Sequence, residues 1–330
     1  MPTMSKQAFE AKLEAVRTLS RAEPSAAVEP LRKMLSDRNN YLVSKAAAVV
    51  AGHQLQELVP NLLAAFDRFM KDPLKTDPQC WAKIAIAKAL VQMDHTTPDL
   101  FVRGVGYAQI EPSYGGSVDT ATDLRATCAL GLVSTTLDSF DILELLTEAL
   151  MDREKPVRVE AVRAIGHLNR PEGLLLLKLK ALAGDQEPEV LANCFAILLE
   201  LGGEKSISFL ERFLTRDAED EAALEAAVAL AASKEPAALE RIQSLWKQRL
   251  PQETREAIVV ALGASPLRDA GKLLLSIVES SPADLAAAAV AALASSRFRK
   301  DVRDELEKLV ALNESAEVQR AWDRYFKSND

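Results

Sequence analysis

The stretch DREKPVRVEAVRAIGHLNRPEGLLLLKLKALAG, residues 152–184, decides the fold. Its first half carries small apolar residues at helical spacing, after Pro156. Proline suits the first turn of a helix because the N–H that it lacks would have no partner inside the helix. Its second half carries leucines at spacings that make one apolar stripe, which another helix must cover. The stretch therefore predicts two helices that pack against each other.

The same pattern recurs along the C-terminal half of the chain. Each unit is aligned on the turn that precedes the helix equivalent to residues 157–166, which is the second helix of a repeat. The units then follow each other at intervals of 31 to 33 residues, with anchors at Asp152, Asp185, Asp217, Arg249, Ser280 and Asn313. Many units have a proline near the end of this turn, as at Pro188, Pro251 and Pro282. A glycine often follows where the helix should end, as at Gly166, Gly202 and Gly263. Such a period is typical of arrays in which each helix pair covers its neighbour.

Three segments carry a resemblance to a known family. VRVEAVRAIGHL, TREAIVVALG and DLRATCALGLV resemble the second helix of HEAT-like repeats, especially the short bacterial type also found in phycobilin lyases. The resemblance covers roughly residues 28–326 and implies an all-α fold, a right-handed α-solenoid of about eight HEAT-like helix pairs. Residues 28–103 follow the pattern less regularly, with Val43 to Gly52 matching Val157 to Gly166 and Trp81 to Leu90.

We expect a single solenoid over residues 1–330. It should begin with a cap helix (1–27) and irregular repeats (28–103), continue with an inserted loop (104–123) and regular repeats (124–312), and end with a cap (313–330). The terminal helices carry charged residues that suit an outward face.

Composition and charge narrow the functional classes. The formal net charge is −8, whereas a protein that grips phosphate backbones is usually basic, so nucleic acid is disfavoured as a partner. No apolar run reaches the roughly 18 residues of a membrane span, and the first residues lack the apolar segment of a signal peptide. The cysteines Cys80, Cys128 and Cys194 lie far apart without a CxxC motif. We expect reduced thiols and a cytoplasmic location.

The sequence contains no recognised catalytic constellation. It has no GxxxxGK[ST], GxGxxG, GxSxG or HExxH motif. The deoxyhypusine hydroxylases, a HEAT-like enzyme family, bind iron with His-Glu pairs, but here His53, His95 and His167 are followed by Gln, Thr and Leu. We therefore predict no enzyme activity, no catalytic residue, no cofactor and no metal.

One feature that could bind a partner is the insertion GVGYAQIEPSYGGSVDTATD, residues 104–123. It interrupts the repeats with turn-forming residues and holds Tyr107 and Tyr114, two of the four tyrosines of the chain. Long loops in compact arrays are usually functional or disordered, and tyrosine is enriched at interfaces. Contact with a partner and a plain mobile loop are both open.

A second feature is a basic residue near the start of several second helices. These residues are Lys45, Lys83, Arg125, Arg158 and Arg255. In HEAT-like arrays the second helices line the concave face, so equivalent positions would form a spaced row of cations. The row could bind an acidic partner, or each cation could pair with an acidic residue of the neighbouring unit, such as Asp152, Asp185 or Asp217.

The resemblance and the missing motifs lead to one leading function and two alternatives. We predict a non-catalytic scaffold that binds another protein through its concave face and inserted loop. One alternative is nucleic-acid binding, including base excision of the kind found in a HEAT-like DNA glycosylase family. The other is a chromophore-handling protein similar to phycobilin lyases.

Overall fold

The computed structural model describes residues 6–214, 221–248 and 250–327, and the described chain is almost entirely helical. It divides into two compact units, residues 1–173 and 174–330. Each unit is an array of stacked helix pairs, which confirms the prediction of an all-α solenoid. Two of the predicted repeat anchors, Asp217 and Arg249, lie outside the described residues.

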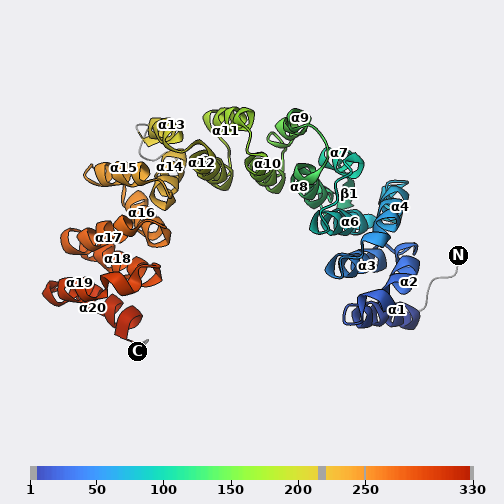
Figure 1. Cartoon of the computed structure of the whole chain (residues 1–330), viewed down its shortest axis with the longest axis horizontal. Coiled ribbons are helices and arrows are strands. Elements are labelled where there is room, and N and C mark those ends of the chain that lie inside the picture. The colour runs from blue at the N-terminus through green and yellow to red at the C-terminus, as the bar shows by residue number, and fades with distance from the viewer. Residues whose placement is uncertain (1–5, 215–220, 249, 328–330) are drawn as a thin grey trace. The chain divides into compact units, whose positions relative to one another are not determined.

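The helices of the first unit form two layers (Figure 1). One layer contains α2 (Pro24–Leu35), α4 (Val59–Phe69), α7 (Asp99–Val105) and α9 (Ser139–Ala149). The other contains α1 (Lys6–Leu19), α3 (Asn40–Gly52), α6 (Trp81–Gln92), α8 (Thr122–Gly131) and α10 (Lys155–Leu168). Neighbouring helices of this second layer pack side by side and bury apolar faces rich in alanine, valine and leucine. Short helical turns lie between successive helices: η1 (Gln56–Leu58), α5 (Pro73–Thr76), η2 (Pro78–Cys80) and η3 (Leu132–Ser134).

The insertion between α7 and α8 is an ordered β-hairpin. Strand β1 (Ile110–Ser113) pairs antiparallel with β2 (Gly116–Asp119), in a register that sets Glu111 opposite Val118. The strands are joined by Tyr114 and Gly115, and Gly115 has φ +85°, a left-handed conformation that glycine adopts at little cost. The segment predicted as a loop therefore contains regular secondary structure, a two-stranded antiparallel hairpin.

The second unit repeats the two-layer arrangement. One layer contains α13 (Glu204–Leu214), α15 (Pro236–Trp246), α17 (Arg268–Ser280) and α19 (Arg299–Leu312). The other contains α12 (Pro188–Gly202), α14 (Glu221–Ala232), α16 (Gln252–Ala264), α18 (Ala283–Ser295) and α20 (Ala316–Trp322), which ends in one π-helical turn, η4 (Asp323–Lys327). Helix α11 (Pro171–Ala183) spans the division between the units.

The helix boundaries explain the prolines and glycines of the repeat. Pro156 and Pro188 lie in the first turns of α10 and α12, as predicted, whereas Pro251 and Pro282 stand one position earlier, at the N-caps of α16 and α18. Gly263 does not end its helix. A Cβ added there would lie 2.9 Å from the carbonyl oxygen of Ala292, so this glycine allows α16 and α18 to approach closely.

No helix in the described ranges is both long and apolar enough to cross a bilayer.

Candidate functional site

The inner face of the hairpin is tied to the turn before α6 by the carboxylate of Glu111. Its Oε1 atom accepts hydrogen bonds of 2.7 Å from the backbone N–H of Gln79, from Nε2 of Gln109 and from the hydroxyl of Thr120. Oε2 accepts a further bond of 3.3 Å from Nε2 of Gln79. Glu111 is only 7% exposed, and a buried carboxylate is tolerated because donors surround it. The hairpin is therefore fixed along its inner face.

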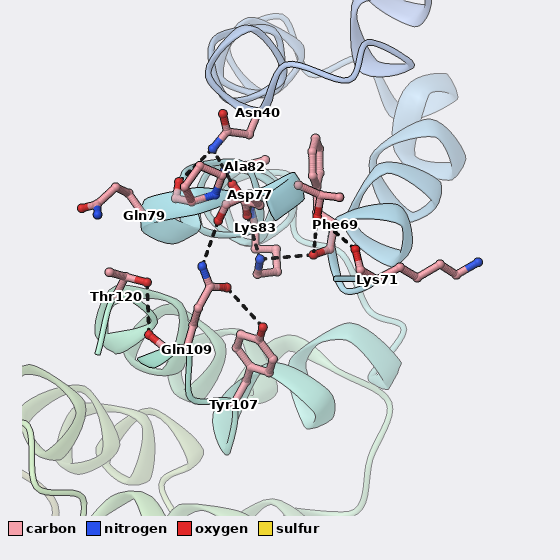
Figure 2. Close-up of polar contacts among 12 residues, drawn as sticks. Asn40, Phe69, Lys71, Asp77, Gln79, Ala82, Lys83, Tyr107, Gln109 and Thr120 are labelled. Atoms are coloured by element: carbon pink, nitrogen blue, oxygen red, sulfur yellow. Dashed lines mark hydrogen bonds and ion pairs between the residues drawn. The ribbon is translucent and has the colours of Figure 1, made fainter. Parts of the chain in front are cut away.

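A buried ion pair of Asp77 and Lys83 lies beside Gln109 (Figure 2). The side chains of Asp77 and Lys83 are both 0% exposed, and Nζ of Lys83 lies 2.8 Å from Oδ2 of Asp77. Asp77 also accepts hydrogen bonds from Nδ2 of Asn40 and from the backbone N–H groups of Ala82 and Lys83, at 2.9 to 3.1 Å. It thereby satisfies free N–H groups in the first turn of α6. The carbonyl oxygen of Asp77 accepts from Nε2 of Gln109, which connects the ion pair to the hairpin.

The turn that Asp77 and Glu111 both contact, at Gln79 and Cys80, has a strained backbone. Gln79 and Cys80 both have left-handed backbones, with φ of +63° and +56°. Such a conformation costs a residue with a side chain about 1 kcal/mol or more, and it persists only where the surroundings impose it. Here Glu111 holds the N–H of Gln79, and the following residues of α6 are held by Asp77. The sequence signal for this turn is absent because neither residue is glycine or asparagine.

A second buried ion cluster joins the base of the hairpin to the next repeat. The guanidinium of Arg125 lies 2.7 Å from Oδ2 of Asp119, at the end of β2, and 2.7 Å from Oδ2 of Asp152, before α10. It also donates to the carbonyl oxygen of Tyr107 at 3.0 Å. The three charged side chains are 5, 7 and 15% exposed, so solvent screens them weakly. Arg125 therefore fixes both ends of the insertion.

Two carboxylates of the hairpin have pKa values below their usual range. Burial alone would raise the pKa of Glu111, but the hydrogen bonds from Thr120, Gln109 and Gln79 outweigh burial and lower it. For Asp119, burial is likewise outweighed by the N–H groups of Ala121 and Gln109 and by Arg125. Both groups are therefore held in the charged form by the folded structure.

We expect the stability that Glu111 contributes to be lost in acid. Because its folded pKa is lowered, the contribution is present above the pKa of an unfolded glutamate, about 4.3, and fades as the pH falls through the lower folded value. The Glu111→Gln variant should be less stable than the wild type at pH 7, with a difference that shrinks below about pH 4. Urea midpoints measured from pH 7 downward test this. A difference that stays constant with pH would contradict it.

Other side chains of the hairpin are exposed. Tyr114 at its tip is 108% exposed, and Ile110 and Val118 on the strands are 49% and 45% exposed. A cavity of about 590 Å³ lies between the hairpin, the end of α7 and the turn that follows α9. Its wall includes the apolar side chains of Ile110 and Met151, and Asp119 and Arg125 also line it. We call this cavity the hairpin groove.

The predicted row of cations is largely buried. Lys83, Arg125 and Arg158 are 0, 4 and 8% exposed, and Arg158 donates to the carbonyl oxygens of Asp152 and Arg153. This corrects the prediction that these three side chains face a partner. Arg125 follows the other alternative, since it pairs with Asp152 of the next repeat.

Lys45 does not belong to the row. The position of α3 that corresponds to the buried Lys83 of α6 is held by Val43, which is also buried. Lys45 is exposed, and its Nζ lies 4.9 Å from the centre of the Tyr41 ring. The sequence alignment of these two helices was therefore shifted by two positions. Arg255, in the second unit, is half-buried and donates to the carbonyl oxygens of Trp246 and Gln248, at the end of α15.

The two tyrosines of the insertion have different surroundings. Tyr107 is half-buried, its hydroxyl donates to Oε1 of Gln109 at 3.2 Å, and Nζ of Lys83 lies 5.6 Å from its ring. Burial raises the pKa of Tyr107 to about 12, and nearby negative charges add to the effect. Tyr107 is thus part of the contacts that hold the hairpin, and of these two tyrosines only Tyr114 is freely available to a partner.

The sequence analysis missed the carboxylates of this site: Asp77, Glu111 and Asp119. A signal for two of them was present. An aspartate stands six residues before each buried cation of the predicted row, at Asp77 and Lys83, at Asp119 and Arg125, and at Asp152 and Arg158. Glu111 has no such signal, because it binds the turn at Gln79, which lies more than thirty residues earlier in the chain.

Neither the cysteines nor the acidic side chains suggest reaction chemistry. Cys80, Cys128 and Cys194 are free and buried, and burial raises the pKa of Cys80 and of Cys194 to about 12. Such thiols are poor nucleophiles. Within the described ranges, no three His, Cys, Asp or Glu side chains are grouped to hold a metal ion.

Comparison with known proteins identifies the repeat. The family model for HEAT repeats matches residues 142–231. No curated protein matches the sequence significantly. Among 17 matching chains of solved structures is human deoxyhypusine hydroxylase in complex with glycerol. It is 20% identical, the match covers 78% of this chain and 91% of that chain, and the TM-score is 0.30.

This structural neighbour corrects one prediction. A matching solved structure is that of an enzyme, deoxyhypusine hydroxylase, so the prediction that the protein has no enzyme activity is not upheld. At a TM-score of 0.30, the similarity assigns no reaction to this chain.

Proposed function

Because the chain is a HEAT-like repeat protein, we propose that it binds another protein, with the hairpin of the first unit as its recognition element. The observation that carries this proposal is the contrast between the fixed and the exposed side chains of the hairpin. Glu111 and Asp119 are tied down by hydrogen bonds and by Arg125. Tyr114 and Ile110 are exposed to solvent. A fixed element loses little conformational entropy on binding, which favours affinity.

The hairpin groove supports the same proposal. Val102, Ile110 and Met151, which line it, are 37, 49 and 71% exposed, so apolar surface is available to a partner side chain. Glu148 and Arg153 stand at the same cavity and are exposed. An apolar centre with charged residues at its edge is the usual composition of a protein interface.

Nucleic acid is a weaker candidate. Three cations of the predicted row are buried, and the net charge of the chain is −8. Counterion release by surface Lys and Arg side chains supplies most of the affinity for nucleic acid, and the buried cations offer no such surface.

The predicted cytoplasmic location remains part of the proposal, and the three free thiols support it.

We expect Tyr114→Ala to weaken partner binding about tenfold or more, because exposed aromatic side chains at the centre of interfaces often dominate affinity. The partner is first isolated from the source cell with the wild-type chain, and its affinity is then measured with purified proteins. Ile110→Glu, which places a charge at the hairpin groove, should have a similar effect.

Leu312→Ala is the matched control, since Leu312 is 82% exposed but lies in the second unit. Both Tyr114→Ala and Leu312→Ala should change the free energy of unfolding by less than about 0.5 kcal/mol. If the partner binds all variants equally, the hairpin is not the recognition element.

A further inference from the structure

A row of aromatic side chains crosses three neighbouring helices of the first unit. The rings of Phe9 on α1 and Tyr41 on α3 lie 6.4 Å apart, and those of Tyr41 and Trp81 on α6 lie 5.2 Å apart. The row is open to solvent, since Trp81 is 47% exposed and the other two are half-buried. Aromatic side chains are more often enclosed in the core, so this surface calls for an explanation. We call it the aromatic row.

The end of the row is fixed by the strained turn. Trp81 is the first residue of α6 and directly follows the two left-handed residues Gln79 and Cys80. Asp77 accepts from the N–H of Ala82, next to Trp81, and Glu111 accepts from the N–H of Gln79. The buried network thus imposes the backbone from which Trp81 projects. Strain of this kind is concentrated at functional sites.

Cations accompany the aromatic row. A groove of about 230 Å³ between α1 and α3 is lined by Tyr41, Lys45 and Arg17, and none of the described residues that line it is a carboxylate. Lys45 has no ion pair within the described part of the chain. Among the described residues, Arg17 pairs only with the exposed Glu14, a contact that contributes little in water. In a chain with a net charge of −8, this groove is a local positive surface.

We propose that the aromatic row and this groove bind an extended, acidic and proline-containing segment of a partner protein, separately from the hairpin. Polyproline segments dock on aromatic-lined surfaces because their extended shape is already formed before binding. Lys45 and Arg17 select carboxylates beside the prolines. Packed helices lie about 8–10 Å apart, so three of them span about 20 Å. About seven residues of a polyproline helix cover that distance.

The ring geometry favours a peptide over single-stranded nucleic acid. Tyr41 and Trp81 meet edge to face, at an interplanar angle of 64°, and Tyr41 is tilted by 49° from Phe9. Successive bases stack on open ring faces, along a groove with many cations. Here the rings cover one another in part, and only two cations line the groove.

The test uses the full chain and a fluorescein-labelled peptide of alternating glutamate and proline, about twelve residues long. Fluorescence anisotropy should show saturable binding that weakens with salt. Peptides of alternating lysine and proline, or of glutamate and glycine, should bind about tenfold more weakly or not at all. Lys45→Glu and Trp81→Ala should each weaken binding of the acidic peptide about tenfold or more.

Leu312→Ala is the matched control, because it removes an exposed apolar side chain from the second unit and should leave binding of this peptide unchanged. Lys45→Glu changes an exposed side chain, so it tests the surface without threatening the fold. The proposal is overturned if the wild type binds none of the peptides. It is also overturned if the two variants bind the acidic peptide as the wild type does, or if an oligothymidine strand binds more tightly. None of these results bears on partner binding by the hairpin, which is measured separately.

Discussion

Asp77→Ala should destabilise the first unit by about 3–5 kcal/mol, the largest effect that we expect from a single substitution. The change leaves the ammonium group of Lys83, which is 0% exposed, without its carboxylate. It also removes the acceptor of Asn40 and of two N–H groups at the start of α6. Buried donors without acceptors add to the cost. We expect the strained turn at Gln79 and Cys80 to relax as a consequence.

Hydrogen exchange followed by mass spectrometry is the suitable measurement, because helical arrays can open unit by unit. Protection should fall in α6 and in the hairpin. Asp67→Ala is the matched control, since Asp67 lies within α4, forms an exposed pair with Arg103 and should cost less than about 1 kcal/mol. Asp77→Ala combined with Lys83→Met should recover part of the loss, because no buried charge then remains unpaired. Equal effects of Asp77→Ala and Asp67→Ala would contradict the assignment of a buried ion pair.

Arg125→Met should destabilise the insertion and its attachment to α10 by about 3–5 kcal/mol. The substitution leaves Asp119 and Asp152 without the guanidinium that lies 2.7 Å from each. It also removes the donor to the carbonyl oxygen of Tyr107. The loss should be greatest near neutral pH. Burial raises the pKa of Asp119, but the N–H groups of Ala121 and Gln109 and the guanidinium of Arg125 together lower it, so Asp119 remains charged there until acid protonates it.

Arg103→Met is the control for this prediction. Arg103 also lies between two aspartates, Asp67 and Asp99, but these side chains are 37, 57 and 73% exposed. Exposed pairs contribute less than about 1 kcal/mol, so this variant should unfold nearly as the wild type does. Urea denaturation of both variants gives the comparison. A loss of similar size in Arg103→Met would show that burial does not set the importance of Arg125.

The regular repeats could be predicted from the sequence because each helix pair meets only its neighbours. Pro156 and Pro188 mark helix starts through local chemistry, and the spacing of the units follows from local packing. The register of α3 could not be fixed in this way. Its alanines and valines allow two alignments with α6, and only the burial of Val43 and Lys83 decides between them.

The hairpin and the residues that hold it could not be predicted, because their positions depend on contacts between segments that are distant in the sequence. The sequence marked Tyr114 and Gly115 as turn-forming, but the flanking strands are four residues each and show no apolar alternation. Glu111 looks like an exposed glutamate until the turn at Gln79 is placed against it. The exposure of Tyr114 and the enclosure of Tyr107 follow from that contact, and the sequence treats the two tyrosines alike.

Photo-crosslinking from the hairpin tip tests most directly whether the hairpin is the recognition element. A benzoylphenylalanine placed at position 114 should give one major adduct in cell extract, with the same protein that binds the wild-type chain. The same group at position 312, which is also exposed, should not give that adduct. An adduct at 114 that disappears with excess unlabelled wild-type chain is the predicted result. No adduct at 114, or the same adducts from both positions, would contradict a binding role for the hairpin.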